Sequence, residues 1–422
     1  MSNIKRLKDK DGNDIFPVTH VNAVFDGNKS LREILNNINI SDNSNNIINV
    51  KNPGNDLVAL TGDNTQTDVG PYIQAMIDAL PLVASDPLTR NGVIYFPPGK
   101  YYIKTPIIVP LGVSLIGSSY SSGYANPSRG FGSLLILNDI TSETTGPVIT
   151  FKGSNLKGFG GCLRDLTFSG NAAGMLCVLL DNVFCFEITG CVFEHLNVKR
   201  AIQTSNCNRI SVRDSDFVFV GDGGKNGSFT TGDAIYFGSA GDSDVFNCFI
   251  ESCGGNAITL GTDCKVSQCF LDLNKNGVSI SGKHNKISDC SIKLNYYAGV
   301  FLGNNSDYTE ISGCSILSNN RRNSGITNSS SANIVIDGNK WFSISDCQFD
   351  GTTSLIDINI KTSSTGYISN CRGRSGDIFI LDTGNAMMKN VHYYKYNIVC
   401  ITQSEYDQLE TKDPNTIYFI KE

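Results

Sequence analysis

The sequence predicts an all-β chain dominated by a right-handed parallel β-helix, a solenoid in which short strands stack coil upon coil. Two observations carry this prediction. A motif, Ile-x-x-Cys-x-(Phe/Ile/Leu), recurs along the middle of the chain, and short alternating apolar segments lie between its copies. Internal repetition at a period of about 20 to 50 residues is typical of solenoids.

The motif is recognised most easily by its cysteine position. Copies are separated by 25, 24, 33, 21, 21, 24, 33 and 24 residues, and two degenerate copies carry Leu or Ser in place of Cys. The positions are Leu166, Cys191, Ser215, Cys248, Cys269, Cys290, Cys314, Cys347 and Cys371. A constant motif with variable spacing indicates that loops of different length leave otherwise similar coils.

The second series alternates apolar and variable residues, as a strand with one buried face does. Its members are Ala234–Phe237, Ala257–Leu260, Gly277–Ile280 and Gly299–Leu302. Each coil therefore contains at least two short strands, and stacking between coils must supply the core.

The residue before each cysteine position is suited to a tight corner. These residues are Asp165, Gly190, Asp214, Asn247, Gln268, Asp289, Gly313, Asp346 and Asn370. Gly, Asn and Asp tolerate left-handed backbone geometry. We interpret the aspartates of this column as turn formers rather than catalysts.

The cysteines are predicted to form one inward column of core residues. Neighbouring coils lie about 4.8 Å apart, and a small, soft side chain packs well at that spacing. The 14 cysteines include no Cys-x-x-Cys, and the four histidines form no ligand pair. No metal site, disulfide or other cofactor is expected.

Composition narrows the functional classes. The net charge is −6 and the pI about 5.3, whereas nucleic-acid-binding domains are usually basic. No run of about 18 apolar residues occurs, and the segment Met1–Arg6 lacks an apolar stretch. We expect no nucleic-acid partner, no membrane insertion, no signal peptide, and synthesis in a reducing cytoplasm.

The region before the repeats resembles a known entry segment. It contains Gly62-Asp…Thr67-Asp68, then an apolar stripe of helical period, then a strand that ends in Phe96-Pro-Pro-Gly99. The stripe is Ile73, Met76, Ile77 and Leu80, preceded by Pro71. This pattern resembles pectate-lyase-like β-helix proteins, common in bacteriophage tailspikes, in which a short helix caps the first coil. The resemblance covers roughly Asn55 to Asn390 and is specific for fold rather than activity.

The N-terminal region has a different character. The stretch Ile4–Val24 resembles attachment segments of virion proteins from phages of gut Bacteroidetes, with Asp11-Gly12 as a hairpin turn. Ser30 to Glu33 is a capping box before a helix with one apolar face. That helix would pack either against copies of itself in a trimeric stalk or on its own β-helix.

The C-terminal region predicts a strand at Ile398–Ile401, a helix capped by Thr402 and Glu405, and a strand at Ile417–Ile420. It resembles a small terminal module of phage structural proteins. The chain is therefore expected to divide into an attachment segment, a linker, the β-helix and an α+β module, at residues 1–40, 41–54, 55–394 and 395–422.

Candidate catalytic residues come from the outward position three residues after each cysteine. This column reads Glu194, Val218, Glu251, Asp272, Lys293, Leu317 and Asp350. Glu251 and Asp272 fall on consecutive coils about 5 Å apart, near the separation that a retaining glycosidase needs. Alternatively the column is a solvated ladder in which Lys293 pairs with Asp272.

Candidate glycan-binding residues are Lys293 and four aromatic residues. Tyr236 and Phe301 should face outward on the second strand, and Tyr296 and Tyr297 lie in an adjoining loop. The long coils between Ser215 and Cys248 and around residues 319–325 could wall a groove or form a subunit contact.

The first functional hypothesis is a phage virion fibre or spike, trimeric, attached to other virion proteins by its N-terminus and presenting its β-helix to host-surface polysaccharide. Such a protein is assembled in the host cytoplasm and acts outside it. The alternative is a polysaccharide depolymerase, a hydrolase or lyase. The signature residues of polygalacturonases and pectate lyases are missing. A further alternative is a purely structural head or tail decoration.

Overall fold

The computed structural model describes most of the chain from residue 46 to residue 421, together with four two-residue strands before it. The gaps are 55, 64–65, 84–85, 119–131, 138–145, 154–157, 222–231, 320–331, 339–340, 351–355, 362–363, 375–377, 383–384, 390, 392, 396 and 410–415. The helix expected around residues 31–38 lies outside the described residues.

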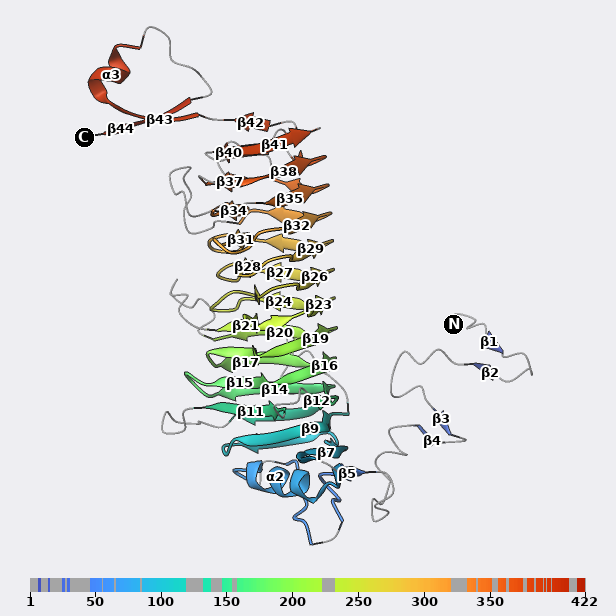
Figure 1. The fold of residues 1–422 in the computed structure, drawn as a ribbon. Helices are drawn as coiled ribbons and strands as arrows, with labels where there is room; N and C mark the ends of the chain where they lie inside the picture. Colours follow the sequence, from blue (N-terminus) through green and yellow to red (C-terminus); the bar gives the residue numbers. More distant parts are fainter. Residues whose placement is uncertain are drawn as a thin grey trace, which may run out of the picture.

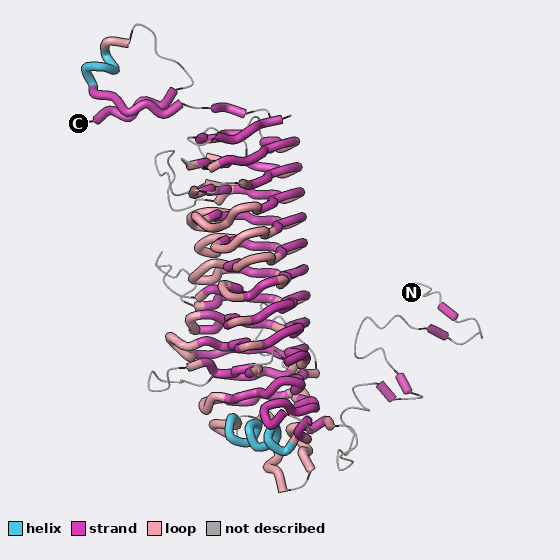
Figure 2. Tube along the Cα trace, viewed as in Figure 1, coloured by secondary structure: helices cyan, strands magenta, loops and turns pink. Residues whose placement is uncertain are grey.

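The described chain winds into an elongated parallel β-helix with three strand columns (Figure 1), which confirms the expected fold class. Figure 2 shows the coils as successive strand segments joined by turns. We name the columns sheets 1, 2 and 3. Within a coil the chain passes from sheet 3 through a tight corner to sheet 1, then through a turn to sheet 2, and back to sheet 3.

Sheet 1 is formed by β8 (Gly99–Ile103), β10 (Ser133–Leu137), β14 (Leu166–Asn171), β17 (Val192–Asn197), β20 (Asp216–Val220), β24 (Phe249–Glu251), β27 (Phe270–Asp272), β30 (Ser291–Lys293), β33 (Ser315–Leu317), β36 (Gln348–Phe349) and β39 (Arg372–Gly373).

Sheet 2 is formed by β9 (Ile107–Ile116), β11 (Pro147–Lys152), β15 (Leu176–Asp181), β18 (Arg200–Ser205), β21 (Asp233–Phe237), β25 (Ile258–Leu260), β28 (Val278–Ile280), β31 (Val300–Leu302), β34 (Ile334–Ile336), β37 (Ile358–Ile360), β40 (Ile378–Asp382) and β42 (Tyr393–Lys395).

Sheet 3 is formed by β5 (Ile47–Asn49), β7 (Asp86–Tyr95), the second half of β9, β12 (Gly158–Phe159), β13 (Cys162–Arg164), β16 (Val183–Thr189), β19 (Cys207–Arg213), β22 (Ala240–Gly241), β23 (Asp244–Phe246), β26 (Lys265–Ser267), β29 (Lys286–Ser288), β32 (Thr309–Ser312), β35 (Phe342–Ser345), β38 (Thr365–Ser369) and β41 (Asn385–Lys389).

The corner between sheets 3 and 1 has the geometry that its residue types predict. All nine residues before the cysteine position have φ between +50° and +64°. Such backbone favours Gly, Asn and Asp, because a Cβ is tolerated there only at some cost. The aspartates of this column are therefore corner residues, as expected.

The seven motif cysteines point into the core, with exposures of at most 3%. The thiols donate to nearby backbone carbonyls, as Cys290 Sγ does to Ser288 O at 3.2 Å. All cysteines with described side chains are free. Burial raises the pKa of the Cys264 thiol to about 11, so this thiol stays protonated at neutral pH.

Aromatic side chains fill the wider early coils. The rings of Phe168, Phe193 and Phe217 stack inside sheet 1, with centroids 4.8 Å apart at each step. This spacing is close to the distance between coils, so the same residue type can repeat with its ring faces in contact.

A buried amide ladder closes the turn between sheets 1 and 2. Asn295 Oδ1 accepts from Asn274 N at 2.9 Å, and Asn295 Nδ2 donates to Asn319 Oδ1 at 2.8 Å. The ladder continues through Asn333, whose Nδ2 donates to Asp357 Oδ1 at 2.8 Å. Because these side chains are at most 2% exposed, each one satisfies backbone groups that water cannot reach.

The predicted cap is present as α2 (Gly70–Ala79), which lies against the first coils at one end of the stack (Figure 1). Its stripe of Ile73, Met76, Ile77 and Leu80 is buried. Asp68 fixes the helix start by accepting from Gly70 N at 3.0 Å and Thr105 Oγ1 at 2.6 Å. Partial burial opposes ionisation of Asp68, but these hydrogen bonds and those from the Lys104 and Thr105 amides lower its pKa.

The flanking elements are small. β1 (Leu7–Lys8) pairs antiparallel with β2 (Asp14–Ile15), in agreement with the expected hairpin, and β3 (Phe25–Asp26) pairs with β4 (Lys29–Ser30). β6 (Leu82–Val83) pairs antiparallel with β7. β5 lies within 41–54, the expected linker, and pairs in parallel with β7. The boundaries of the four segments stay a prediction.

The C-terminal module has the predicted order. β43 (Asn397–Thr402) pairs in parallel with β44 (Thr416–Lys421), and α3 (Gln403–Asp407) follows β43. Thr402 and Glu405 form the predicted capping box, with Thr402 N donating to Glu405 Oε2 at 2.7 Å. Among the described residues, no helix is long and apolar enough to cross a membrane.

The ladder generates a stability prediction. Asn295→Ala should lower the free energy of unfolding by about 2–4 kcal/mol, because it leaves buried backbone groups of two coils without partners. Denaturant unfolding followed by circular dichroism measures the change. Asn305→Ala, at an exposed turn position, is the control and should change stability by under about 0.5 kcal/mol. Equal effects of the two substitutions would contradict a stabilising role for the ladder.

Candidate glycan-binding surface

The outer face of sheet 1 presents two columns of side chains, one and three residues after each cysteine position. Strand register places Glu251, Asp272 and Lys293 opposite one another on β24, β27 and β30. Asp272 is 9% exposed, while Glu251 and Lys293 are half-buried. The two candidate carboxylates therefore stand on adjacent strands, which lie about 4.8 Å apart.

The neighbouring column contains an aromatic pair. Phe249 and Phe270 stack on the outer surface with ring centroids 5.1 Å apart and planes inclined by 6°. Both rings are partly exposed. Lys293 Nζ lies 4.6 Å from the centroid of Phe270, a cation–π distance. The lysine thus extends the aromatic pair by one coil.

A carboxyl group borders the aromatic pair. Asp216 on β20 is opposite Phe249 in the strand register. Burial, reinforced by the negative charge of Glu194, raises the pKa of Asp216 to about 6. A carboxyl group with this pKa is partly protonated near neutral pH and can act as a proton donor.

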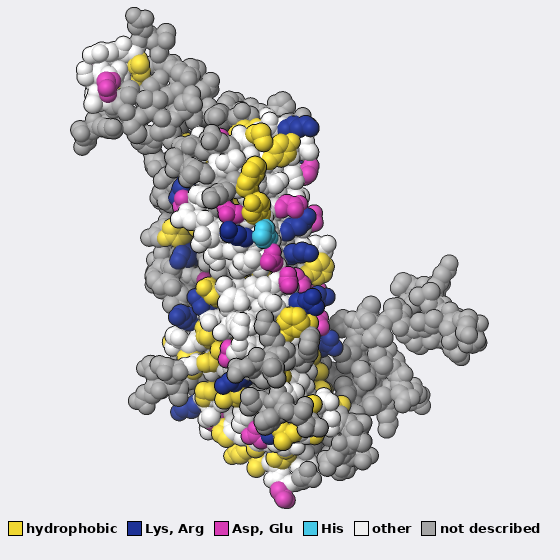
Figure 3. Space-filling view, in the orientation of Figure 1, with side chains coloured by type: hydrophobic (Ala, Val, Ile, Leu, Met, Phe, Trp, Pro, Cys, Tyr) yellow, Lys and Arg dark blue, Asp and Glu magenta, His cyan; other side chains and the backbone are white. Residues whose placement is uncertain are grey.

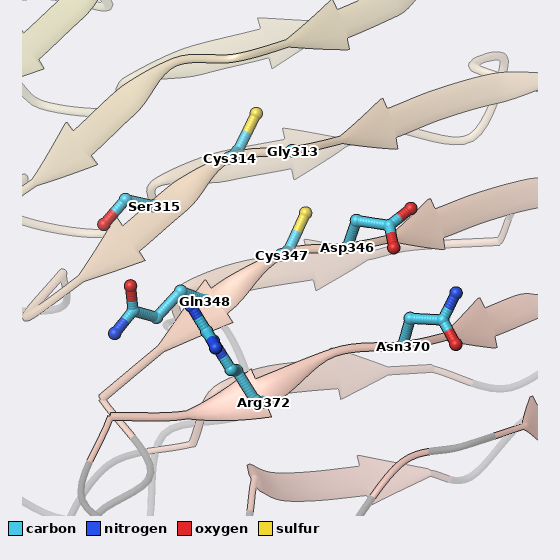
Figure 4. A pocket seen from close by; sticks show the side chains of 8 residues that line it. All are labelled: Gly313, Cys314, Ser315, Asp346, Cys347, Gln348, Asn370 and Arg372. Carbon is cyan, nitrogen blue, oxygen red and sulfur yellow. The ribbon is translucent and has the colours of Figure 1, made fainter.

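Beyond the aromatic pair, the side chains of the same column are polar and line a groove. Ser315, Gln348 and Arg372 follow Ser291 in register on β33, β36 and β39. With the corner residues Asp346 and Asn370, they surround a volume of about 380 Å³. In Figure 4 the Arg372 side chain extends toward Gln348 across the groove. A guanidinium group at this place can bind a carboxylate in a bidentate manner.

The predicted glycan-binding residues are divided between two surfaces. Tyr296 and Tyr297 are half-buried in the turn after Lys293, and the Tyr297 amide donates to Lys275 O at 3.0 Å. Lys293 ends β30, and the two tyrosines lie in the turn that leads from it to β31. Tyr236 and Phe301 lie on sheet 2 instead.

Tyr236 and Phe301 face outward in one column, but two coils separate them. The Arg200 guanidinium lies 3.6 Å from the centroid of the Tyr236 ring, so that face of the ring is covered. Phe301 packs against an outer apolar cluster that includes Val335 and Phe379. The structure does not bring these two residues together with Lys293.

Sequence reasoning missed the aromatic pair, Asp216 and the polar groove. The signal was present, because Phe249 and Phe270 directly follow cysteines of the motif. Applying the inward and outward alternation one residue after cysteine, as well as three residues after it, would have identified them. No group of three or more potential metal ligands occurs among the residues that the structure describes.

Three family models match parts of the chain. A model of the rhamnogalacturonase A/epimerase, pectate-lyase-like family matches residues 18–155, and one of the right-handed β-helix region matches residues 149–316. A model of the phage tail tip domain matches residues 396–421, which include β43, α3 and β44. No curated protein matches the chain.

Solved structures share the fold at low identity. The tailspike protein of Escherichia coli bacteriophage HK620, in complex with a pentasaccharide, is 12% identical with a TM-score of 0.53; the match covers 92% of this chain and 68% of that one. The A-module of the mannuronan C-5 epimerase AlgE4 of Azotobacter vinelandii is 14% identical with a TM-score of 0.51, covering 89% and 100%. ORF18 of Geobacillus virus E2 is 14% identical with a TM-score of 0.49, and the match spans 82% of this chain but 60% of that one.

The raised pKa of Asp216 generates a prediction about pH. The folded state favours the protonated carboxyl group, so its contribution to stability is complete below about pH 3.8 and is lost as the pH rises through about 6. Asp216→Asn should therefore be more stable than wild type above pH 6, by about 1 kcal/mol after allowance for solvent screening. Thermal melting from pH 4 to pH 8 measures this difference.

The control is Asp242→Asn, which changes an exposed carboxylate at a turn where Asn tolerates the left-handed backbone. Its melting curve should follow that of wild type at every pH. A constant difference between Asp216→Asn and wild type across the range would contradict the raised pKa.

Proposed function

We propose that the chain is a phage tailspike built on a parallel β-helix and that it binds host-surface glycan through the outer face of sheet 1 from β20 to β39. The bound glycan would attach the virion to its host. Family matches to the β-helix and to the phage tail tip domain support the premise. A tailspike of similar fold was solved with a pentasaccharide, which is consistent with glycan as the ligand class.

The observation that carries the proposal is the partly exposed stack of Phe249 and Phe270 with Lys293 over its end. The outward edges of the stacked rings offer an apolar surface that a pyranose ring can contact, while nearby polar groups bind the hydroxyls. Glu251 and Asp272 stand beside the rings in the neighbouring column. Rigid coils hold the whole arrangement, so little entropy is lost on binding.

The polar groove extends this surface toward the C-terminal coils. Arg372 places a cation at its end, and Gln348 and Asn370 contribute amide groups. This composition suits a sugar that carries a carboxylate or another anionic substituent. We therefore infer that a glycan lying along sheet 1 has neutral residues over the phenyl rings and an acidic residue near Arg372.

The N-terminal residues 1–40 are proposed to attach the protein to other virion proteins and to support a homotrimer. Residues 41–54 would connect this segment to the β-helix of residues 55–394, and residues 395–422 would form the terminal module. The match of residues 396–421 to a phage tail tip domain supports a place in the virion.

A binding experiment tests the glycan surface. Full-length protein is passed over immobilised polysaccharide from the host surface, and Phe270→Ala should weaken saturable binding about tenfold, a loss of about 1.4 kcal/mol. Tyr72→Ala, which removes an exposed ring from α2, is the matched control and should bind like wild type. Retained affinity in Phe270→Ala would reject this surface, and absence of any binding by wild type would favour a purely structural decoration.

A second candidate function is depolymerisation of the bound polysaccharide. The observation that favours it is Asp216, whose pKa of about 6 suits a general acid, near the ionisable Glu194. Glu251 and Asp272 provide a second pair of carboxylates on the same face. Hydrolysis would add water across a glycosidic bond, whereas elimination would leave an unsaturated uronate.

Incubation with host polysaccharide distinguishes binding from catalysis. Reducing ends would report either reaction, and ultraviolet absorbance of an unsaturated uronate would report elimination. Glycosidase activity through Asp216 should fall as the pH rises above 6, because its proton is lost. Asp216→Asn, Glu251→Gln and Asp272→Asn should then separate the roles of the two pairs. Saturable binding without product would leave an adhesin.

Assembly is tested separately. Sedimentation of the full chain should give a trimer, and a monomer would reject that state. Deletion of residues 1–40 should weaken assembly while the circular dichroism spectrum of the β-helix is retained. Global unfolding of the deletion variant would contradict the proposed division of the chain.

A further inference from the structure

A second row of aromatic side chains lies at the opposite edge of sheet 3 from the corner to sheet 1. His284, Tyr308 and Trp341 each stand just before a sheet 3 strand, namely β29, β32 and β35. Strand register places them on consecutive coils, since Lys286 is opposite Glu310 and Thr309 is opposite Phe342. Figure 3 shows hydrophobic side chains aligned along the upper coils beside a histidine.

The three rings are open to solvent. The side chain of His284 is 54% exposed, and Tyr308 and Trp341 are 55% and 51% exposed. The rings of His284 and Tyr308 stack with centroids 5.1 Å apart, and the Tyr308 amide donates to Trp341 O at 2.7 Å. The row is therefore ordered by the coil stacking, and the outward edges of its rings stay open to solvent.

The backbone at this row does not by itself call for aromatic residues. His284 and Tyr308 have φ of +56° and +60°, left-handed values that favour Gly, Asn or Asp. The corner between sheets 3 and 1 uses mainly those small residues at the same φ. A bulky ring held at such a turn costs free energy.

Charges around the row are arranged in pairs. Asp263 Oδ1 lies 3.3 Å from His284 Nδ1, Lys283 Nζ lies 3.6 Å from Asp307 Oδ2, and the next pair, Lys286 and Glu310, is 2.9 Å apart. The two lysine–carboxylate pairs provide hydrogen-bonding atoms beside the rings with little net charge to select a charged ligand.

We propose that His284, Tyr308 and Trp341 form a contact platform for a neutral polysaccharide whose chain runs along the axis of the β-helix. A row one ring wide, bordered by polar groups, fits a single sugar chain better than a broad apolar protein interface. The platform is separate from the outer face of sheet 1, so it does not depend on the proposed function of that face.

The chain contains one tryptophan, so its tryptophan fluorescence reports on Trp341 alone. Acrylamide quenching of its fluorescence is measured in full-length protein titrated with cellohexaose, mannohexaose, xylohexaose and N-acetylchitohexaose. At least one oligosaccharide should protect the indole in a saturable manner. Failure of all four to protect it would overturn the proposal, as would an indole already shielded in the free protein by another copy of the chain.

Substitutions locate the binding. Tyr308→Asn removes a ring but suits the left-handed backbone, and it should raise the Kd for the protecting oligosaccharide about three- to tenfold. Tyr72→Ala, which removes an exposed ring from α2, should leave this Kd unchanged. An unchanged Kd in Tyr308→Asn, with wild-type melting, would overturn the platform even if sheet 1 binds its own glycan.

Discussion

The structure depends on the hydrogen bonding of each coil to the next at a spacing of about 4.8 Å. This spacing places every side chain beside its equivalent one coil away. A residue type therefore repeats where contact with itself is favourable, as for the inward cysteines and the stack of Phe168, Phe193 and Phe217. The same constraint acts outside, where Phe249 and Phe270 stack because they occupy equivalent positions. Core packing and outward side-chain columns follow from one geometry.

Polar groups inside such a solenoid need partners along its axis as well. The Asn274 backbone amide donates to the Asn295 side chain, and the Asn295 amide donates to the Asn319 side chain one coil further on. The ladder ends on the buried Asp357. It lies at the turn that follows sheet 1, directly after the strands that present the carboxylates and phenyl rings. A fully paired buried network makes this turn rigid, which holds the outward columns in fixed register.

The sequence predicts the fold well because the motif shows which side chains point into the core as well as where each coil repeats. The left-handed residue before each cysteine, the inward cysteine and the capping stripe on α2 all follow from residue type and period. The same alternation identified Glu251, Asp272 and Lys293 as neighbours. It could not show that Arg200 covers Tyr236 or that Phe301 packs against an outer cluster, because those contacts come from coils of unequal length.

Exposure is the property that sequence conveys least. Outward phenylalanines, tyrosines and a lone tryptophan read alike in a list of residues, yet Trp341 is 51% exposed and Phe379 is 2% exposed. What separates them is the course of neighbouring turns. Surfaces that bind polysaccharide weakly at single rings gain from repetition, since a chain held at one coil has a high effective concentration at the next. A rigid solenoid with two outward aromatic rows is suited to this kind of binding, because its repeats and those of a polysaccharide both extend along one axis.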